Sequence, residues 1–237
     1  MELKMYYQIS KELTDKLPNV FFGAVAVRGL DNSKKIPELE AMLAEEIAKR
    51  EAYFEDKKVK EDEHVVPYRE AFRALDMNPN KFLCSIEALL TRIAKKKGFP
   101  SINAAVDLGN AISIKYFLPI GAHDLSTIAE GLDVRAARDG DTFVAFGETE
   151  KETPDPGEIV YVSGNEVRTR RWTWRQSEVG KITESTTDIL FPIDGFLGFN
   201  EDTVRAAADE FAELLEKFFG CSCKTGFVDK EHPRFEF

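Results

Sequence analysis

Apolar residues follow this chain in two different patterns, one typical of helices and one typical of strands. From Ile36 to Phe54, apolar side chains recur every three, four or seven residues with Glu and Lys between them. This spacing predicts an amphipathic helix. Residues 20–30 instead form a continuous apolar run, rich in Val and Phe, between two turn-forming segments. Such a run is expected of a buried strand.

Four further helices are predicted from residues that start and stop helices. The first is predicted to start at Pro67. The second is predicted to be capped by Ser85 and to end at Gly98, and the third, which covers 102–117, is predicted to be capped by Ser101. The last is predicted to be capped by Asn200 and to end at Gly220. Gly109 lies inside the third helix, where a glycine lowers helix stability.

Beyond Gly140 the pattern changes to short strands separated by Pro- and Gly-containing turns. The predicted strands cover residues 142–146, 158–163, 167–175, 182–193 and 224–229. An antiparallel sheet flanked by helices is the simplest arrangement, and the order of helical and stranded blocks predicts the α+β class. Residues 1–64 are expected to add a strand and a helix that pack on a main unit, 65–237, without a separating linker.

Composition limits the classes of function. The chain has 237 residues, 43% hydrophobic and 31% charged, which is enough for a substantial core. Its 42 acidic and 32 basic residues give a net charge of −10, which argues against a protein that coats nucleic acid, so any RNA contact must be local. We expect no DNA partner. We also expect a cytoplasmic protein without a membrane segment, because no signal peptide or long apolar stretch is present and three cysteines suit a reducing compartment.

Familiar catalytic and cofactor motifs are absent from the sequence. There is no Walker loop, no dinucleotide-binding glycine motif, no nucleophile elbow and no zinc-protease motif. The three histidines are far apart, and Cys221-x-Cys223 has no second Cys or His pair nearby. We therefore expect no cofactor and no metal.

The most unusual segment is residues 168–175, which holds four arginines and both tryptophans of the chain. On a strand, Arg168, Arg170, Trp172 and Trp174 would share one face. One interpretation is a surface that stacks on bases or pairs with phosphates. The other is a half-buried strand whose tryptophans join the core while its arginines pair with carboxylates, and composition favours this second interpretation.

Two other groups of polar residues are candidates for a site. His123 precedes Asp124, but adjacent residues on a strand point in opposite directions, so no catalytic triad is implied. Asn103 and Asn110 are two helical turns apart, so both amides can address one pocket. Helix capping or a hydrogen-bonded turn is the commoner explanation of the first pair, and a solvated helix face that of the second.

Three segments in order carry a resemblance to a known family. They are Ser101-Ile102-Asn103-x-x-Val106-Asp107-x-x-Asn110, Leu118-Pro119-x-x-Ala122-x-Asp124-Leu125, and Glu178 followed by Ile182-Thr183-x-x-Thr186-x-x-Ile189-Leu190. Together they resemble the B3/B4 editing module of the bacterial phenylalanyl-tRNA synthetase β subunit. The resemblance covers roughly residues 65–200 and makes the chain similar to free-standing B3/B4 domain proteins.

The resemblance implies an editing activity and a set of site residues. In the synthetase, the module hydrolyses the ester of tyrosine wrongly attached to the phenylalanine tRNA, and Glu178 matches the glutamate that recognises the tyrosine hydroxyl. Asn103 and Asn110 match the asparagine-bearing helix. Gly121 stands where the family has a histidine, and His123 lies two residues later. Arg175-Gln176-Ser177 replaces a glycine-rich turn.

From these residues the sequence predicts a trans-acting aminoacyl-tRNA deacylase. An aminoacyl ester is already activated, so positioning a water and stabilising the oxyanion can suffice. Glu178 is expected to recognise the substrate or orient the water, and the acceptor end of an aminoacyl-tRNA is the expected partner. The expected substrate-binding residues are Asn103, Asn110, Gly121, His123, Arg175, Gln176 and Ser177, and the expected RNA contacts are Arg168, Arg170 and Arg171. The alternatives are a noncatalytic module that binds an amino acid, another small molecule, a tRNA end or a protein partner, and a hydrolase of another ester or amide.

Overall fold

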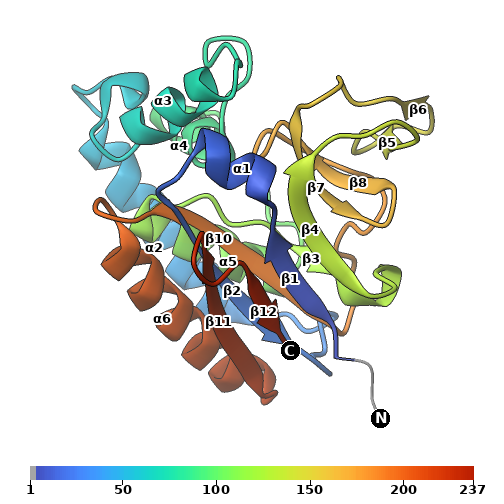
Figure 1. Cartoon of the computed structure of the whole chain (residues 1–237). Helices are drawn as coiled ribbons and strands as arrows, with labels where there is room; N and C mark the ends of the chain where they lie inside the picture. The colour runs from blue at the N-terminus through green and yellow to red at the C-terminus, as the bar shows by residue number, and fades with distance from the viewer. Residues whose placement is uncertain (1–3) are drawn as a thin grey trace.

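Figure 1 shows the computed structural model of the chain, which describes residues 4–237. Within this range the helices are α1 (Lys11–Lys16), α2 (Pro37–Tyr53), α3 (Val66–Ala74), α4 (Ser85–Ala94), α5 (Ala104–Tyr116) and α6 (Glu201–Phe219), with short 3₁₀-helices at Val59–Glu61 and Leu125–Thr127. The strands are β1 (Tyr6–Ile9), β2 (Val20–Val27), β3 (His123–Asp124), β4 (Gly131–Ala136), β5 (Phe143–Val144), β6 (Lys151–Glu152), β7 (Ile159–Ser163), β8 (Glu166–Arg170), β9 (Arg175–Gln176), β10 (Ile189–Phe196), β11 (Cys223–Asp229) and β12 (Arg234–Glu236).

An antiparallel four-stranded sheet, in the order β11-β2-β10-β3, separates two apolar cores. Phe21 and Val25 of β2 pack with side chains of α5 and α6, whereas Phe22 and Ala24 face the other core. This division follows from the two-residue repeat of a strand. Every residue of β2 is buried because both of its faces are covered, which confirms the predicted buried strand.

A second sheet, in the order β12-β1-β4-β7-β8-β9, carries the Arg- and Trp-rich segment. Its pairs are antiparallel except β1 with β4, which run in parallel. Both β1 and β2 lie between strands from the later part of the chain. Residues 1–64 are therefore interleaved with residues 65–237 in both sheets and do not simply pack against them. The mixture of helices with largely antiparallel sheets confirms the α+β class.

Several predicted helices are confirmed with small shifts at their ends. The helix predicted from Ile36 to Phe54 is α2, and the helix predicted at Pro67 is α3, which has Pro at its first turn. Asn200 and Gly220 bound α6 as predicted. Gly220 has a left-handed backbone (φ 67°), the conformation that commonly ends a helix at glycine.

Two predicted helix ends are wrong. Cys84, rather than Ser85, occupies the cap position of α4, and the helix stops at Ala94 instead of continuing to Gly98. Lys96 takes a left-handed conformation (φ 52°) that a continuing α-helix does not allow. The first glycine after a helix therefore does not always mark its end.

The cap of α5 is Asn103, two residues later than the predicted Ser101. Asn103 Oδ1 accepts a hydrogen bond from the Val106 backbone N–H (3.1 Å). Ser101 Oγ instead donates to the Asp107 carboxylate (2.5 Å), which also accepts from the Ile102 N–H. Asn and Ser are both strong cap residues, so local sequence did not separate the two choices.

The strands predicted at 142–146 and 182–193 are shorter in the structure. Only Phe143–Val144 pair as β5, and residues 182–188 form a loop before β10. In that loop, Thr186 Oγ1 donates to the Asp124 carboxylate (2.9 Å) and accepts from the Thr183 N–H (3.0 Å). Side chains that satisfy nearby backbone and carboxylate groups in this way favour a turn over a strand.

Candidate functional site

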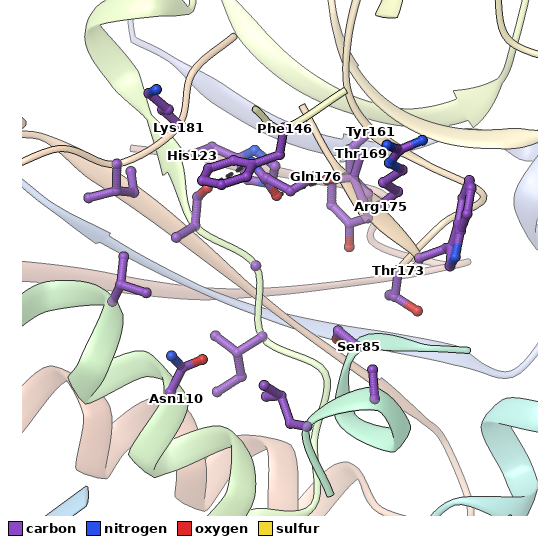
Figure 2. Close-up of a pocket in the computed structure, with 18 of the residues that line it drawn as sticks. Ser85, Asn110, His123, Phe146, Tyr161, Thr169, Thr173, Arg175, Gln176 and Lys181 are labelled. Atoms are coloured by element: carbon purple, nitrogen blue, oxygen red, sulfur yellow. Dashed lines mark hydrogen bonds between the residues drawn. The ribbon is translucent and has the colours of Figure 1, made fainter. Parts of the chain in front are cut away.

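A cavity of about 510 Å³ opens between α4 and α5 on one side and the β7-β8-β9 region on the other (Figure 2). Its apolar lining is Ala88, Leu89, Ile102, Val106, Ile120, Ala122, Phe146, Trp172, Trp174 and Ile182. Its polar and ionisable lining is Ser85, Asn110, His123, Tyr161, Thr169, Thr173, Arg175, Gln176, Lys181 and Asp194, and Gly121 also borders it. Phe146 and Ile102 are 58% and 52% exposed, so they stand at the mouth.

A hairpin places the two tryptophans on this cavity. The predicted strand 167–175 is wrong, because β8 ends at Arg170 and the chain turns back into β9 at Arg175. Arg171 and Trp172 have left-handed backbones (φ 47° and 60°) in this turn. The turn buries the Trp172 ring, which stacks 6.0 Å from the ring of Phe22 on β2.

Asp194, on β10, is the buried carboxylate of the cavity. It is 2% exposed, and its Oδ1 accepts hydrogen bonds from Tyr161 Oη (2.6 Å) and Trp172 Nε1 (2.8 Å). Burial raises the pKa of Asp194 to about 7, although both hydrogen bonds oppose the shift. In residues 4–237 no ion pair offsets its charge.

His123, on β3, is the buried imidazole of the cavity. Its ring stacks on that of Tyr161 (centroids 5.6 Å apart), and its Nδ1 has no hydrogen-bond partner in residues 4–237. Burial, assisted by the nearby Arg168 guanidinium, lowers the pKa of His123 to about 3. The ring is therefore neutral at physiological pH. A Cβ atom at Gly121 would lie 3.3 Å from His123 Nε2, so the glycine leaves room beside the ring.

The structure brings five of the predicted site residues together around the cavity. Asn110 reaches it from α5, Gly121 and His123 from β3 and the loop before it, and Arg175 and Gln176 from β9. Gln176 Nε2 donates to the Ala122 carbonyl (3.4 Å), and Arg175 Nη2 donates to Glu148 (2.8 Å).

Three other predicted site residues lie outside the cavity lining. Asn103 does not share a pocket with Asn110, because it caps α5 and its Nδ2 donates to the Ile182 carbonyl (3.3 Å). Ser177 is fully buried and its Oγ donates to the Val144 carbonyl (3.0 Å). Glu178 is half-buried, pairs with Lys181 and accepts a hydrogen bond from the Gly147 N–H (2.9 Å). These two contacts lower the pKa of Glu178.

The three arginines expected to contact RNA do not form an exposed basic surface. The Arg168 side chain is buried and donates to the Thr127 carbonyl (2.7 Å). Arg170 is buried and makes two hydrogen bonds to Glu158 (2.8 and 2.9 Å), while Arg171 pairs with Asp155. The interpretation in which these arginines pair with carboxylates and a tryptophan joins the core is therefore the correct one.

The sequence reasoning missed six polar residues of the cavity: Ser85, Tyr161, Thr169, Thr173, Lys181 and Asp194. Thr173 Oγ1 is buried without a hydrogen-bond partner in residues 4–237. A signal for Asp194 was present, since it is the one acid inside the apolar run Ile189–Phe196. A charged residue inside a buried strand generally has a specific partner or a function.

Metal and membrane features were also sought in the described chain. No group of three or more His, Cys, Asp or Glu side chains in residues 4–237 could hold a metal ion. Nor does the described part contain a helix that is both long and apolar enough to span a bilayer. Burial raises the pKa values of Cys84 and Cys223 to about 12, so neither thiol is activated as a nucleophile.

Comparison with known proteins identifies the family of the chain. A solved structure of an N-terminal fragment of the phenylalanyl-tRNA synthetase beta-subunit from Pyrococcus horikoshii has a similar fold, with a TM-score of 0.50 and 13% sequence identity. The match covers 98% of this chain and 53% of that fragment, so this chain spans about half of the fragment's length. No curated protein sequence matches the chain significantly. The sequence profile of the B3/4 domain matches residues 67–220, which confirms the resemblance seen in the motifs. The chain belongs to the B3/4 domain family.

Proposed function

We propose that this chain hydrolyses the ester bond of incorrectly charged aminoacyl-tRNA in trans, with the aminoacyl group held in the cavity. One observation carries the proposal: all the lining residues fall between Ser85 and Asp194, inside the segment that matches the B3/4 family. The similar solved structure is a fragment of a tRNA synthetase subunit, which supports a tRNA-related function.

The size and lining of the cavity suit an aminoacyl group. Its volume of about 510 Å³ lies within the range of roughly 300–1,000 Å³ that is usual for small-molecule sites. Side chains such as Leu89, Val106 and Ile182 offer apolar contact to an amino-acid side chain. The exposed Phe146 and Ile102 leave the mouth open for a larger attached group, such as a tRNA end.

The polar lining suits hydrolysis by a positioned water. In this reaction water attacks the ester carbonyl carbon, a tetrahedral oxyanion forms, and the ribose oxygen departs with a proton. His123 is neutral, so one ring nitrogen donates a hydrogen bond and the other accepts one. Its Nε2 lies beside Gly121 in the cavity lining and makes no hydrogen bond with residues 4–237, and we assign it to orienting the water.

Arg175 and Lys181 are the cations at the mouth that we assign to the tRNA phosphates. Each is about a third or more exposed and is paired with a carboxylate, Glu148 for Arg175 and Glu178 for Lys181. Exposed ion pairs of this kind are worth about 0–1 kcal/mol, so a phosphate can replace the carboxylate at low cost. We place Glu178 at the mouth, where it acts through Lys181.

The proposal is tested by measuring amino-acid release from charged tRNA. The purified chain is incubated with a panel of tRNAs that carry correct or incorrect labelled amino acids, with an editing phenylalanyl-tRNA synthetase as positive control. We expect faster release from at least one mischarged tRNA, and no accelerated release from any member of the panel would refute the proposal. Unchanged release by Glu178→Ala would remove that residue from the site.

A noncatalytic module that binds an amino acid or a related small molecule is the second candidate. The pairing of both mouth cations with carboxylates favours it, because in the described chain the mouth then offers phosphates no free positive charge. This candidate predicts small-molecule binding that responds little to salt and is accompanied by no ester hydrolysis. Binding to a tRNA end would instead weaken as salt rises.

A further inference from the structure

We propose that Asp194 is the specificity-determining residue of the cavity and that its free carboxylate oxygen binds an ammonium group of the ligand. The inference takes from the proposed function only that the cavity receives an aminoacyl or amino-acid group. It adds a chemical class, because it requires a ligand with a positively charged nitrogen.

The two oxygens of Asp194 have different surroundings. Oδ1 already accepts two hydrogen bonds, from Tyr161 and Trp172. Oδ2 accepts none from residues 4–237 and is not among the fully buried atoms that lack a partner, so it faces the cavity that Asp194 lines. The two donors on Oδ1 fix the direction in which Oδ2 points, so the acceptor is positioned before any ligand arrives.

The charge of Asp194 has no ion-pair partner within residues 4–237. The cations that line the cavity, Arg175 and Lys181, pair with Glu148 and Glu178 at the mouth. A buried carboxylate without a cation is costly, and a ligand ammonium would supply the missing charge in a charge-assisted hydrogen bond. The surrounding aromatic rings, among them Trp172 and Tyr161, also favour a cation.

Asp194 is the group of the cavity that changes charge near neutral pH. Burial raises its pKa to about 7 and lowers that of His123 to about 3. The other titratable groups that face Asp194 are Tyr7 on β1, Tyr68 on α3, Cys84 before α4 and Tyr161 on β7, and the pKa of each is raised above its ordinary value. Binding of a side-chain ammonium, which stays charged over this range, should therefore strengthen by roughly tenfold between pH 6 and pH 8 as Asp194 ionises, whereas an α-ammonium begins to lose its charge at the upper end of the range.

The experiment is a fluorescence titration, because Trp172 and Trp174 are the two tryptophans of the chain and both line the cavity. L-phenylalaninamide offers an α-ammonium, and Nα-acetyl-L-lysinamide offers a side-chain ammonium. N-acetyl-L-phenylalaninamide carries no charge and N-acetyl-L-tyrosinamide adds only a hydroxyl. We expect at least one of the two ammonium ligands to bind more tightly than the two uncharged amides. Comparing L-phenylalaninamide with Nα-acetyl-L-lysinamide then shows whether an α-ammonium or a side-chain ammonium is recognised.

Two variants show whether Asp194 is responsible. Asp194→Asn keeps an acceptor for Tyr161 and Trp172 but loses the charge, so ammonium binding should weaken by roughly 10- to 100-fold and should no longer strengthen as pH rises from 6 to 8. The matched control is Asp133→Asn on β4, whose carboxylate accepts from Tyr6 Oη (3.3 Å) outside the cavity, and its affinity should equal that of the unmodified chain. Circular dichroism spectra are recorded to check that each variant is folded.

Three results would overturn the inference: no binding of either ammonium ligand, equal binding by Asp194→Asn, or tightest binding of the tyrosine compound without pH dependence. None of these results bears on hydrolysis of aminoacyl-tRNA. Conversely, Asp194-dependent binding without amino-acid release from any tRNA would refute the proposed activity and leave this inference standing.

Discussion

The raised pKa of Asp194 makes a prediction about folding that needs no ligand. In the folded chain this pKa is about 7, against an ordinary value of 3.8. The folded state therefore binds the proton more tightly than the unfolded state. The stability from this proton is fully present below about pH 4 and is lost as pH rises through 7. A difference of about three pKa units corresponds to about 4 kcal/mol in total.

Asp194→Asn removes this titration and should gain stability relative to the unmodified chain as pH rises. Over the window from pH 5 to pH 8, the pKa values of 3.8 and about 7 give a relative gain of about 2–3 kcal/mol. The amide still accepts hydrogen bonds from Tyr161 and Trp172, so little packing changes. Comparing the two proteins at each pH cancels the contribution of the other carboxylates.

The assay is urea unfolding followed by far-ultraviolet circular dichroism at several pH values between 5 and 8. Glu178→Gln is the control, because the pKa of Glu178 is lowered and its titration falls below this window. Its stability relative to the unmodified chain should stay constant from pH 5 to pH 8. If the difference in free energy of unfolding between Asp194→Asn and the unmodified chain stayed constant from pH 5 to pH 8, the reasoning would be refuted. If the unmodified chain instead became the more stable of the two at high pH, a cation would have to pair with Asp194.

Three further predictions concern the fold and the mouth of the cavity. Gly109→Ala should raise the free energy of unfolding by about 0.5–1 kcal/mol in urea unfolding, because a Cβ would lie 3.6 Å from its nearest neighbour, an ordinary contact within a helix; destabilisation would contradict this. Trp172→Ala should lower the free energy of unfolding by about 3–5 kcal/mol in the same measurement, because its side chain is fully buried. Trp174→Ala should lower it clearly less, because that side chain is only half-buried. Equal losses in the two variants would show that the hairpin does not bury Trp172. Arg175→Gln and Lys181→Gln should each reduce by about 1 the salt dependence of aminoacyl-tRNA binding, measured by filter binding as log affinity against log salt; unchanged slopes would exclude phosphate contacts by these side chains.

The helices and the buried strands were largely predictable because their signals are local. The spacing of apolar residues between Ile36 and Phe54 and the glycine at 220 act within a few residues of chain. The buried strand β2 was equally clear, because a strand covered on both faces needs a continuous apolar run.

The hairpin between β8 and β9 was not predictable from the same signals. Left-handed backbone positions usually hold Gly, Asn or Asp, but here they hold Arg171 and Trp172. The turn is stabilised by distant parts of the chain: the Trp172 ring packs on Phe22 and its Nε1–H bonds to Asp194. Strand alternation therefore does not hold beyond Arg170, where β8 ends.

The candidate site was predicted in part, for a similar reason. Asn110, His123 and Gln176 line the cavity and lie inside the segment that matches the B3/4 family, although only Asn110 stands at a position of the family's motif. Glu178 lies outside the lining, where it pairs with Lys181 and accepts a hydrogen bond from the Gly147 N–H. Asp194 was missed because its donors, Tyr161 and Trp172, come from other strands and turns that only the folded chain brings together.

The central claim is that the cavity between α4, α5 and the β8–β9 hairpin processes the aminoacyl end of a mischarged tRNA. The most direct measurement compares the release of labelled amino acid by the unmodified chain and by Val106→Phe. This variant replaces a small side chain of α5 that lines the cavity with a bulky aromatic ring. We predict accelerated release from at least one mischarged tRNA by the unmodified chain, and its loss in the folded variant. Equal release by both proteins, or release by neither, would contradict the claim.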